Sequence, residues 1–174
     1  MASAQQISTK VGKNKRSVDN TKASDHMQAK ITNNTKMEMT LFKSNSWSGS
    51  PEDAFPKFIN PNTTVTFNHK FDGGFGSKAA VIYSGTNLAS FPCAWVLGWY
   101  APTTPSVDTP NQVYVTCGAQ TAIEAIPWDQ ISMQIDAAPD SNSDDDPTTK
   151  ITVTAKYDDK IPDTATIEAT FGLM

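Results

Sequence analysis

The chain has 174 residues, of which 38% are hydrophobic and 18% are charged, and its formal net charge is −4 at pH 7. This length suits one ordinary domain and is too short for two full-sized ones. No apolar run approaches the roughly 18 residues that a transmembrane helix needs, and residues 1–6 do not begin an apolar signal-peptide core. We therefore expect a soluble, unsecreted protein of the cytoplasm or the nucleus.

Charge is distributed unevenly along the chain. Residues 1–43 carry eight Lys or Arg against three Asp or Glu, a net +5, whereas the remainder carries six against fifteen, a net −9. Residues 1–27 have too few apolar side chains to offset the entropy of ordering them. We expect a flexible basic tail over 1–27 and a single β-sandwich domain over 28–174.

The basic tail is also a candidate nucleic-acid or nuclear-import segment. Its main cations are Lys10, Lys13, Lys15 and Arg16. No aromatic residues are interleaved among them to stack on bases, which disfavours RNA binding. We favour a solvated tail, and an RNA-binding tail stays open as an alternative.

Scarce Leu and abundant Thr, Ser, Asn, Val and Ile favour strands over helices. In the first half of the chain, alternation of apolar and polar residues predicts strands at 29–42, 63–71 and 79–83, with a turn at Asn33-Asn34, a loop at 44–56 and turns at 72–77 and 84–87. The next segment, Cys93–Tyr100, is apolar on both faces, which is typical of a strand buried between two layers. We expect it to be the central strand of the core.

The second half continues this pattern with one interruption. A Pro- and Thr-rich loop at 101–111 leads to a strand at 112–117, an amphipathic helix near 127–137, a polar segment at 140–147, and two alternating strands at 150–157 and 164–171 joined by a hairpin turn. The sequence therefore predicts an all-β protein, an antiparallel sandwich of about seven or eight strands with one short helix.

Only two cysteines are present, Cys93 and Cys117, and they lack the spacing of a metal or redox motif. Reduced, packed thiols are the default in a cytosolic protein. If the strands that carry them are antiparallel neighbours, the two thiols lie near one another. They then form a possible cross-strand pair that could oxidise in an oxidising compartment.

Catalytic patterns are weak in this chain. The imidazoles are His26, in the expected tail, and His69, on the apolar face of a strand, where a packed histidine is the simpler interpretation. The glycine-rich segment Asp72–Ser77 lacks the order of a phosphate-binding loop and predicts a turn. The acidic run Asp144–Asp146 lacks the calcium-loop pattern. We expect no enzyme, no catalytic residue, no metal site and no cofactor.

Aromatic residues next to loops are the remaining signal. Trp47 and Tyr100 each border a Pro-, Ser- or Thr-rich loop, where a ring can stack on a sugar or enter a lipid headgroup layer. Acidic neighbours are Glu52, Asp53 and Asp108. These five residues form a candidate ligand-binding rim, with packing under surface loops as the alternative.

Five stretches resemble one known family. They are Ile31–Thr35 (ITNNT), Gly76–Asn87 (GSKAAVIYSGTN), Cys93–Trp99 (CAWVLGW), Asn111–Tyr114 (NQVY) and Pro127–Ile131 (PWDQI). Over residues 29–137 the chain resembles the small jasmonate-induced proteins of plants. The resemblance implies a cytosolic or nuclear protein that accumulates under jasmonate, salt or drought stress, and it supplies no catalytic or binding residue.

A fainter similarity in strand order, and in the apolar strand 76–83 (GSKAAVIY), points to actinoporin-like β-sandwiches, a group that includes lipid-binding toxins and fungal fruit-body lectins. Our leading hypothesis is therefore a non-enzymatic, stress-responsive plant protein that acts by binding. The alternative is a cytosolic lectin or lipid-headgroup binder, with a glycan or a headgroup as partner. The oligomeric state stays open, and a homo-oligomer is one option.

Overall fold

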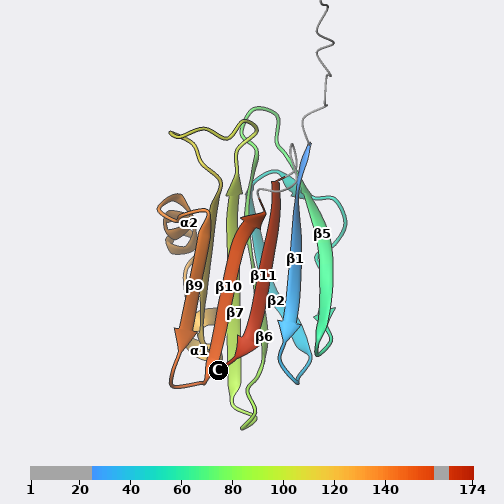
Figure 1. Ribbon diagram of the computed structural model, residues 1–174, viewed down its shortest axis with the longest axis vertical. Coiled ribbons are helices and arrows are strands. Elements are labelled where there is room, and N and C mark those ends of the chain that lie inside the picture. Colours follow the sequence, from blue (N-terminus) through green and yellow to red (C-terminus); the bar gives the residue numbers. More distant parts are fainter. Residues whose placement is uncertain (1–24, 159–164) are drawn as a thin grey trace, which may run out of the picture.

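The computed structural model describes residues 25–158 and 165–174, which form two stacked β-sheets (Figure 1). Sheet A has the spatial order β3 (Ser50–Pro51), β5 (Thr63–Lys70), β1 (His26–Asn34), β11 (Ala165–Leu173), β10 (Ile151–Asp158) and β9 (Ser141–Asp146). Sheet B has the order β4 (Phe58–Ile59), β2 (Met39–Ser48), β6 (Ser77–Thr86), β7 (Pro92–Ala101) and β8 (Gln112–Ala119). The predicted all-β sandwich is confirmed.

Neighbouring strands are antiparallel except β1 and β11, which run parallel. Two helices, α1 (Gln120–Glu124) and α2 (Trp128–Asp136), follow β8 and cover the outer face of sheet B. Helix α2 confirms the predicted helix, whereas α1 was missed. No helix among the described residues is long and apolar enough to cross a membrane.

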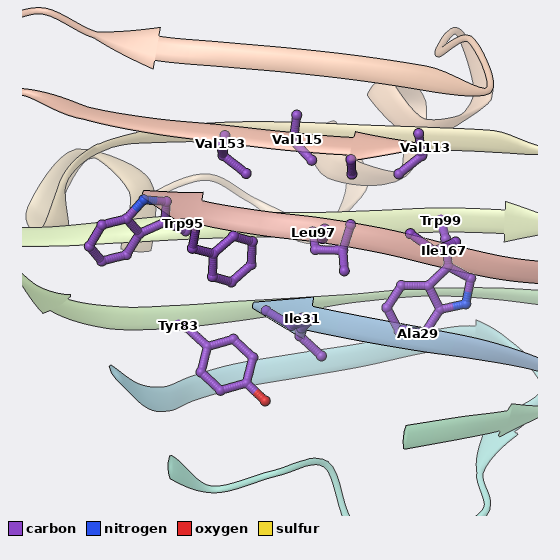
Figure 2. Packing of buried hydrophobic residues seen from close by; sticks show 14 of the residues in the cluster. Ala29, Ile31, Tyr83, Trp95, Leu97, Trp99, Val113, Val115, Val153 and Ile167 are labelled. Atoms are coloured by element: carbon purple, nitrogen blue, oxygen red, sulfur yellow. The ribbon is translucent and has the colours of Figure 1, made fainter. Parts of the chain in front are cut away.

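The main core fills the space between the sheets, where the inward-facing side chains of both sheets meet (Figure 2). Its largest fully buried members include Trp95, Trp99, Tyr83 and Phe171. The rings of Trp95 in sheet B and Phe171 in sheet A stack with centroids 6.3 Å apart. These contacts across the seam join the two sheets.

A second apolar cluster lies on the outer face of sheet B. There Ile131 and Ile135 of α2 pack on small side chains of β6 and β7. Gly98 allows this approach, because a Cβ atom at that position would lie 2.7 Å from Cδ1 of Ile135. Strand β7 is therefore apolar on both faces, as predicted, although β6 rather than β7 occupies the middle of the five-stranded sheet.

Three segment predictions were wrong. The expected loop at 44–56 begins too early, because β2 continues to Ser48 through two register shifts that break its alternation. The expected turn at 84–87 is displaced, because β6 continues to Thr86 and the turn closes where Asn87 N–H donates to the Phe91 carbonyl, 3.0 Å away. The polar segment at 140–147 contains strand β9.

The N-terminal boundary of the domain also differs from the expected one. Strand β1 begins at His26, and Met27 is fully buried in the core, so these two residues belong to the sandwich and not to a tail. Residues 1–24 of the predicted basic tail, which include Lys10, Lys13, Lys15 and Arg16, lie outside the described residues. The same holds for all but the first residue of the expected hairpin turn at 158–163, while the strands on either side of it pair antiparallel as predicted.

Candidate functional site

The five residues of the predicted rim occupy one end of the sandwich, where β2 and β7 end and β6 and β8 begin (Figure 1). They nevertheless have different neighbours. Trp47 lies against the outer face of sheet B, where its ring meets that of Trp128 edge-on with centroids 6.0 Å apart. Glu52 lies at the edge of sheet A, where it accepts a hydrogen bond from Asn68 Nδ2 at 2.9 Å and pairs with Lys70 Nζ at 3.8 Å.

The other three rim residues are placed as follows. Tyr100 is half-buried on the outer face of sheet B, and its backbone carbonyl accepts a hydrogen bond from Tyr157 Oη at 2.9 Å. Asp53 and Asp108 are exposed, and Asp108 lies in the loop between β7 and β8. A shared role of these residues in binding stays a prediction.

A groove of about 600 Å³ opens at the same end of the sandwich, between the β7–β8 loop, the start of β9, the end of β10 and the start of β11. We call it the end groove. Its volume lies within the roughly 300–1,000 Å³ of small-molecule sites. The lining residues are Pro105, Ser106, Val107, Pro110, Asn111, Asp140, Ser141, Lys156, Tyr157, Asp158 and Ala165.

The end groove combines polar groups with one aromatic ring. Asp140 and Asp158 contribute carboxylates, and Lys156 contributes an ammonium group. The Oδ1 atom of Asn111 is buried and has no hydrogen-bond partner among the described residues. Burial raises the pKa of the Tyr157 phenol, which stays neutral at physiological pH. Such a lining suits a ligand that presents hydroxyl groups and little charge.

His69 is a packed core histidine, as predicted. Its Nε2 and Nδ1 atoms lie 2.9 Å from the hydroxyls of Ser46 and Ser77, and Trp99 Nε1 donates to Ser77 Oγ at 2.8 Å. Burial lowers the pKa of His69 to about 4, so the imidazole is neutral at physiological pH. The side chain links β5 of sheet A to β2 and β6 of sheet B.

Both cysteines are buried free thiols on neighbouring antiparallel strands. The register places Cys93 opposite Ala119 and Cys117 opposite Trp95, so the two are offset by two residues. Burial raises the pKa of both thiols, that of Cys117 to about 12. Few thiolates therefore form at neutral pH, and oxidation of the pair stays a prediction.

The glycine-rich and acidic segments have structural roles. Asp72 N–H donates to the Gly76 carbonyl at 2.8 Å, which closes the predicted turn. Asp144 Oδ2 accepts hydrogen bonds from Thr116 Oγ1 at 2.7 Å and from the Cys117 N–H at 3.1 Å. Within residues 25–158 and 165–174, no group of three or more His, Cys, Asp or Glu side chains is arranged to hold a metal ion.

Comparison with known proteins confirms the resemblance drawn from the sequence. The jasmonate-induced protein homolog of Atriplex canescens is 36% identical over 155 residues, which cover 88% of this chain and 83% of that protein. The chain belongs to the jasmonate-induced protein family. The assignment rests on this relative, since no protein-family model matches the chain.

The fold of this jasmonate-induced family member resembles that of one solved structure, and a second structure matches more weakly. The lipid-binding protein Nakanori matches with a TM-score of 0.70 and 15% identity over 84% of this chain and 70% of that one. The lectin XCL of Xerocomus chrysenteron matches with a TM-score of 0.45 and 11% identity over 86% of this chain and 99% of that one. At 15% identity the likeness to Nakanori concerns the fold alone.

Proposed function

We propose that this protein is a non-enzymatic binding protein of the stress response, and that its end groove binds a neutral, hydroxyl-rich ligand, a glycan. The lining of the end groove carries this proposal. It presents the carboxylates of Asp140 and Asp158 and the hydroxyls of Ser106 and Ser141 beside the ring of Tyr157. Acceptors of this kind take hydrogen bonds from sugar hydroxyls, and the flank of an aromatic ring suits the apolar face of a sugar.

Charge favours a neutral ligand over an anionic one. The end groove has two carboxylates, on Asp140 and Asp158, against the single ammonium of Lys156. The chain from residue 44 onward has a net charge of −9, from six Lys or Arg and fifteen Asp or Glu. This field repels phosphatidylserine or phosphate groups. A zwitterionic headgroup such as phosphocholine is the lipid alternative that the same charges tolerate.

The side chains that could act as a catalytic base or nucleophile, those of His69 and the two cysteines, are buried and weakly reactive, which supports a binding role rather than catalysis. His69 is buried with a pKa lowered to about 4, which makes it a weak base at neutral pH. The two thiols are buried with raised pKa values. The stress response is inferred from the family, whose curated member is named for its induction by jasmonate. A cytoplasmic or nuclear location is part of the same proposal.

The proposal is tested with the full-length chain on an array of neutral and acidic glycans, in parallel with vesicles of phosphatidylcholine and of phosphatidylserine. We expect saturable binding to neutral glycans only. Binding to phosphatidylcholine vesicles alone would replace the glycan by a zwitterionic headgroup. A folded sample that binds neither would overturn the proposal.

Variants then locate the site. Asp140→Asn and Asn111→Ala change groups of the end groove, and we expect each to weaken glycan binding by about tenfold, since a hydrogen bond to a buried or charged group contributes about 1–3 kcal/mol. Asp72→Asn is the matched control, because Asp72 is an exposed carboxylate outside the groove lining. Asp108→Asn distinguishes binding in the end groove from binding on the predicted rim, because Asp108 belongs to the rim and does not line the groove. A loss of binding with Asp108→Asn but not with Asp140→Asn would place the ligand on the rim.

A further inference from the structure

A second hollow of about 430 Å³ lies over β9, β10 and β11 on the outer face of sheet A, and we call it the face furrow. Its lining residues are Ser141, Asn142, Ser143, Thr154, Ala155, Lys156, Glu168 and Thr170. Two of them, Ser141 and Lys156, also line the end groove. The face furrow therefore continues the end groove from the loop end along the sheet.

The face furrow contains hydroxyls aligned across three strands. The register places Ser143 opposite Thr154, and Thr154 opposite Thr170. Beyond the furrow the same row continues to Thr32 and Thr64, whose hydroxyls lie 2.8 Å apart. Adjacent members of such a row are separated by the strand spacing of about 4.8 Å, which is comparable with the length of one sugar ring.

These hydroxyls are available to a ligand. Within the described part of the chain, the side chains of Ser141, Ser143, Thr154 and Thr170 form no hydrogen bond to the protein. Ser143 and Thr154 are exposed, and Thr170 is half-buried. Each hydroxyl can both donate and accept, as sugar hydroxyls do.

The charges of the face furrow balance one another. Its lining has one cation, Lys156, directly opposite one anion, Glu168. Glu168 also pairs with Lys30 of β1 at 3.8 Å. No aromatic side chain lines the furrow. A ligand there is held by hydrogen bonds along its length, which favours a neutral chain of hydroxylated units over a charged polymer.

From this continuity we propose that the ligand is a linear neutral oligosaccharide, with one end in the end groove and the following units along the face furrow. This inference rests on the proposed function, because the end groove supplies the first contact. It adds a property that a single-sugar site lacks: each further unit over the furrow forms additional hydrogen bonds, so affinity rises with chain length until the furrow is filled.

The test measures dissociation constants by calorimetry for the full-length protein, with cello-, xylo- and manno-oligosaccharides from the monosaccharide to the hexasaccharide. We expect at least a tenfold gain in affinity between the monosaccharide and the tetrasaccharide in one series, followed by a plateau. Thr154→Val combined with Thr170→Val removes two hydroxyls at nearly constant shape. It should remove most of the gain and leave monosaccharide affinity unchanged.

Thr66→Val is the matched control, because Thr66 is an exposed outward residue of β5 outside the furrow. If the affinity for oligosaccharides is the same at every chain length but is still reduced by Asp140→Asn, the proposed role of the face furrow is wrong and the proposed function of the end groove stands. A length-dependent gain that survives the double valine variant would also overturn it. If no sugar of any length binds the folded protein, both proposals fail.

Discussion

The outer faces of the two sheets differ in what covers them. On sheet B, helices α1 and α2 bury the outer sides of β6 and β7 under Ile123, Ile131 and Ile135. On sheet A, the described residues place no helix over the outer side, and its outward residues are mostly Thr, Ser, Lys and Glu. Strands β6 and β7 of sheet B are therefore apolar on both faces over most of their length, while the long strands of sheet A alternate.

This difference separates two tasks within one sandwich. A strand that is buried on both faces contributes apolar contacts on both sides, and almost any polar substitution there costs stability. A strand with one open polar face can change its outward side chains at little cost, so these are available for ligand contacts. The open face adjoins the end groove, whereas the covered face adds buried apolar contacts between sheet B and the two helices.

The largest expected effect comes from a substitution that weakens the packing of helix α2 on sheet B. Ile135→Ala removes a fully buried side chain that packs on Gly98, and we expect the free energy of unfolding to fall by about 2–5 kcal/mol. Met133→Ala on the same helix is the control, because Met133 is 64% exposed. Urea unfolding measures both variants, and equal losses would contradict a helix that is held by its inner face.

A comparable effect concerns the seam between the sheets. The buried His69 has a folded pKa of about 4, whereas the imidazole has its ordinary pKa of 6.5 once unfolding exposes it to water. Above pH 6.5 both states are neutral and the shift contributes nothing. As the pH falls from 6.5 to 4, the unfolded state binds a proton that the folded state does not, so the free energy of unfolding falls by about 3 kcal/mol.

The pH dependence is measured by urea unfolding at intervals from pH 7.5 to pH 4. In His69→Gln the titrating group is absent, while the exposed carboxylates stay the same. We expect the decline between pH 6.5 and pH 4 to be much shallower in this variant than in the parent protein. Parallel curves for the two proteins would show that another group controls acid stability.

A smaller effect separates packing from binding at Trp47. Its ring is half-buried against Trp128 and lies 5.7 Å from Lys78 Nζ. Trp47→Ala should lower the free energy of unfolding by about 1–3 kcal/mol and leave glycan binding by the folded protein unchanged. Phe75→Ala, at an exposed loop position, is the control for stability. If Trp47→Ala abolishes glycan binding without changing the free energy of unfolding, Trp47 contacts the ligand.

The sequence predicted those parts of the fold that have simple periodicity. The segment 63–71 alternates because only one face of β5 is buried, and the segment 93–100 is apolar throughout because helices cover its second face. Strand β9 was missed because its sequence, SNSDDD, is typical of a turn. It forms a strand because Asn142 and Asp144 face β8, where they hydrogen-bond to Val113 O and Thr116 Oγ1.

The end groove could not be predicted from local patterns. Its lining comes from the β7–β8 loop and from the ends of β9, β10 and β11, which the topology brings together from distant parts of the chain. The aromatic-rim hypothesis pointed, through Tyr100 and Asp108, to the same end of the sandwich as the end groove, and a binding role for these residues stays a prediction. The hypothesis could not show that Trp47 packs on a tryptophan from a later helix.

The smallest expected effect tests the open face of sheet A directly. Thr154→Val keeps a β-branched side chain in the middle of β10 and removes an outward hydroxyl that has no partner within the described residues. We expect the free energy of unfolding to change by no more than about 0.5 kcal/mol in urea unfolding.

Val96→Thr makes the reverse change on the covered face of sheet B, where the added hydroxyl is buried between β7 and the helices. It should cost about 1–3 kcal/mol, because burial of a hydroxyl without a partner is unfavourable. Similar costs for the two variants would mean that the outer face of sheet A is covered in solution, and the face furrow would then be closed to a ligand.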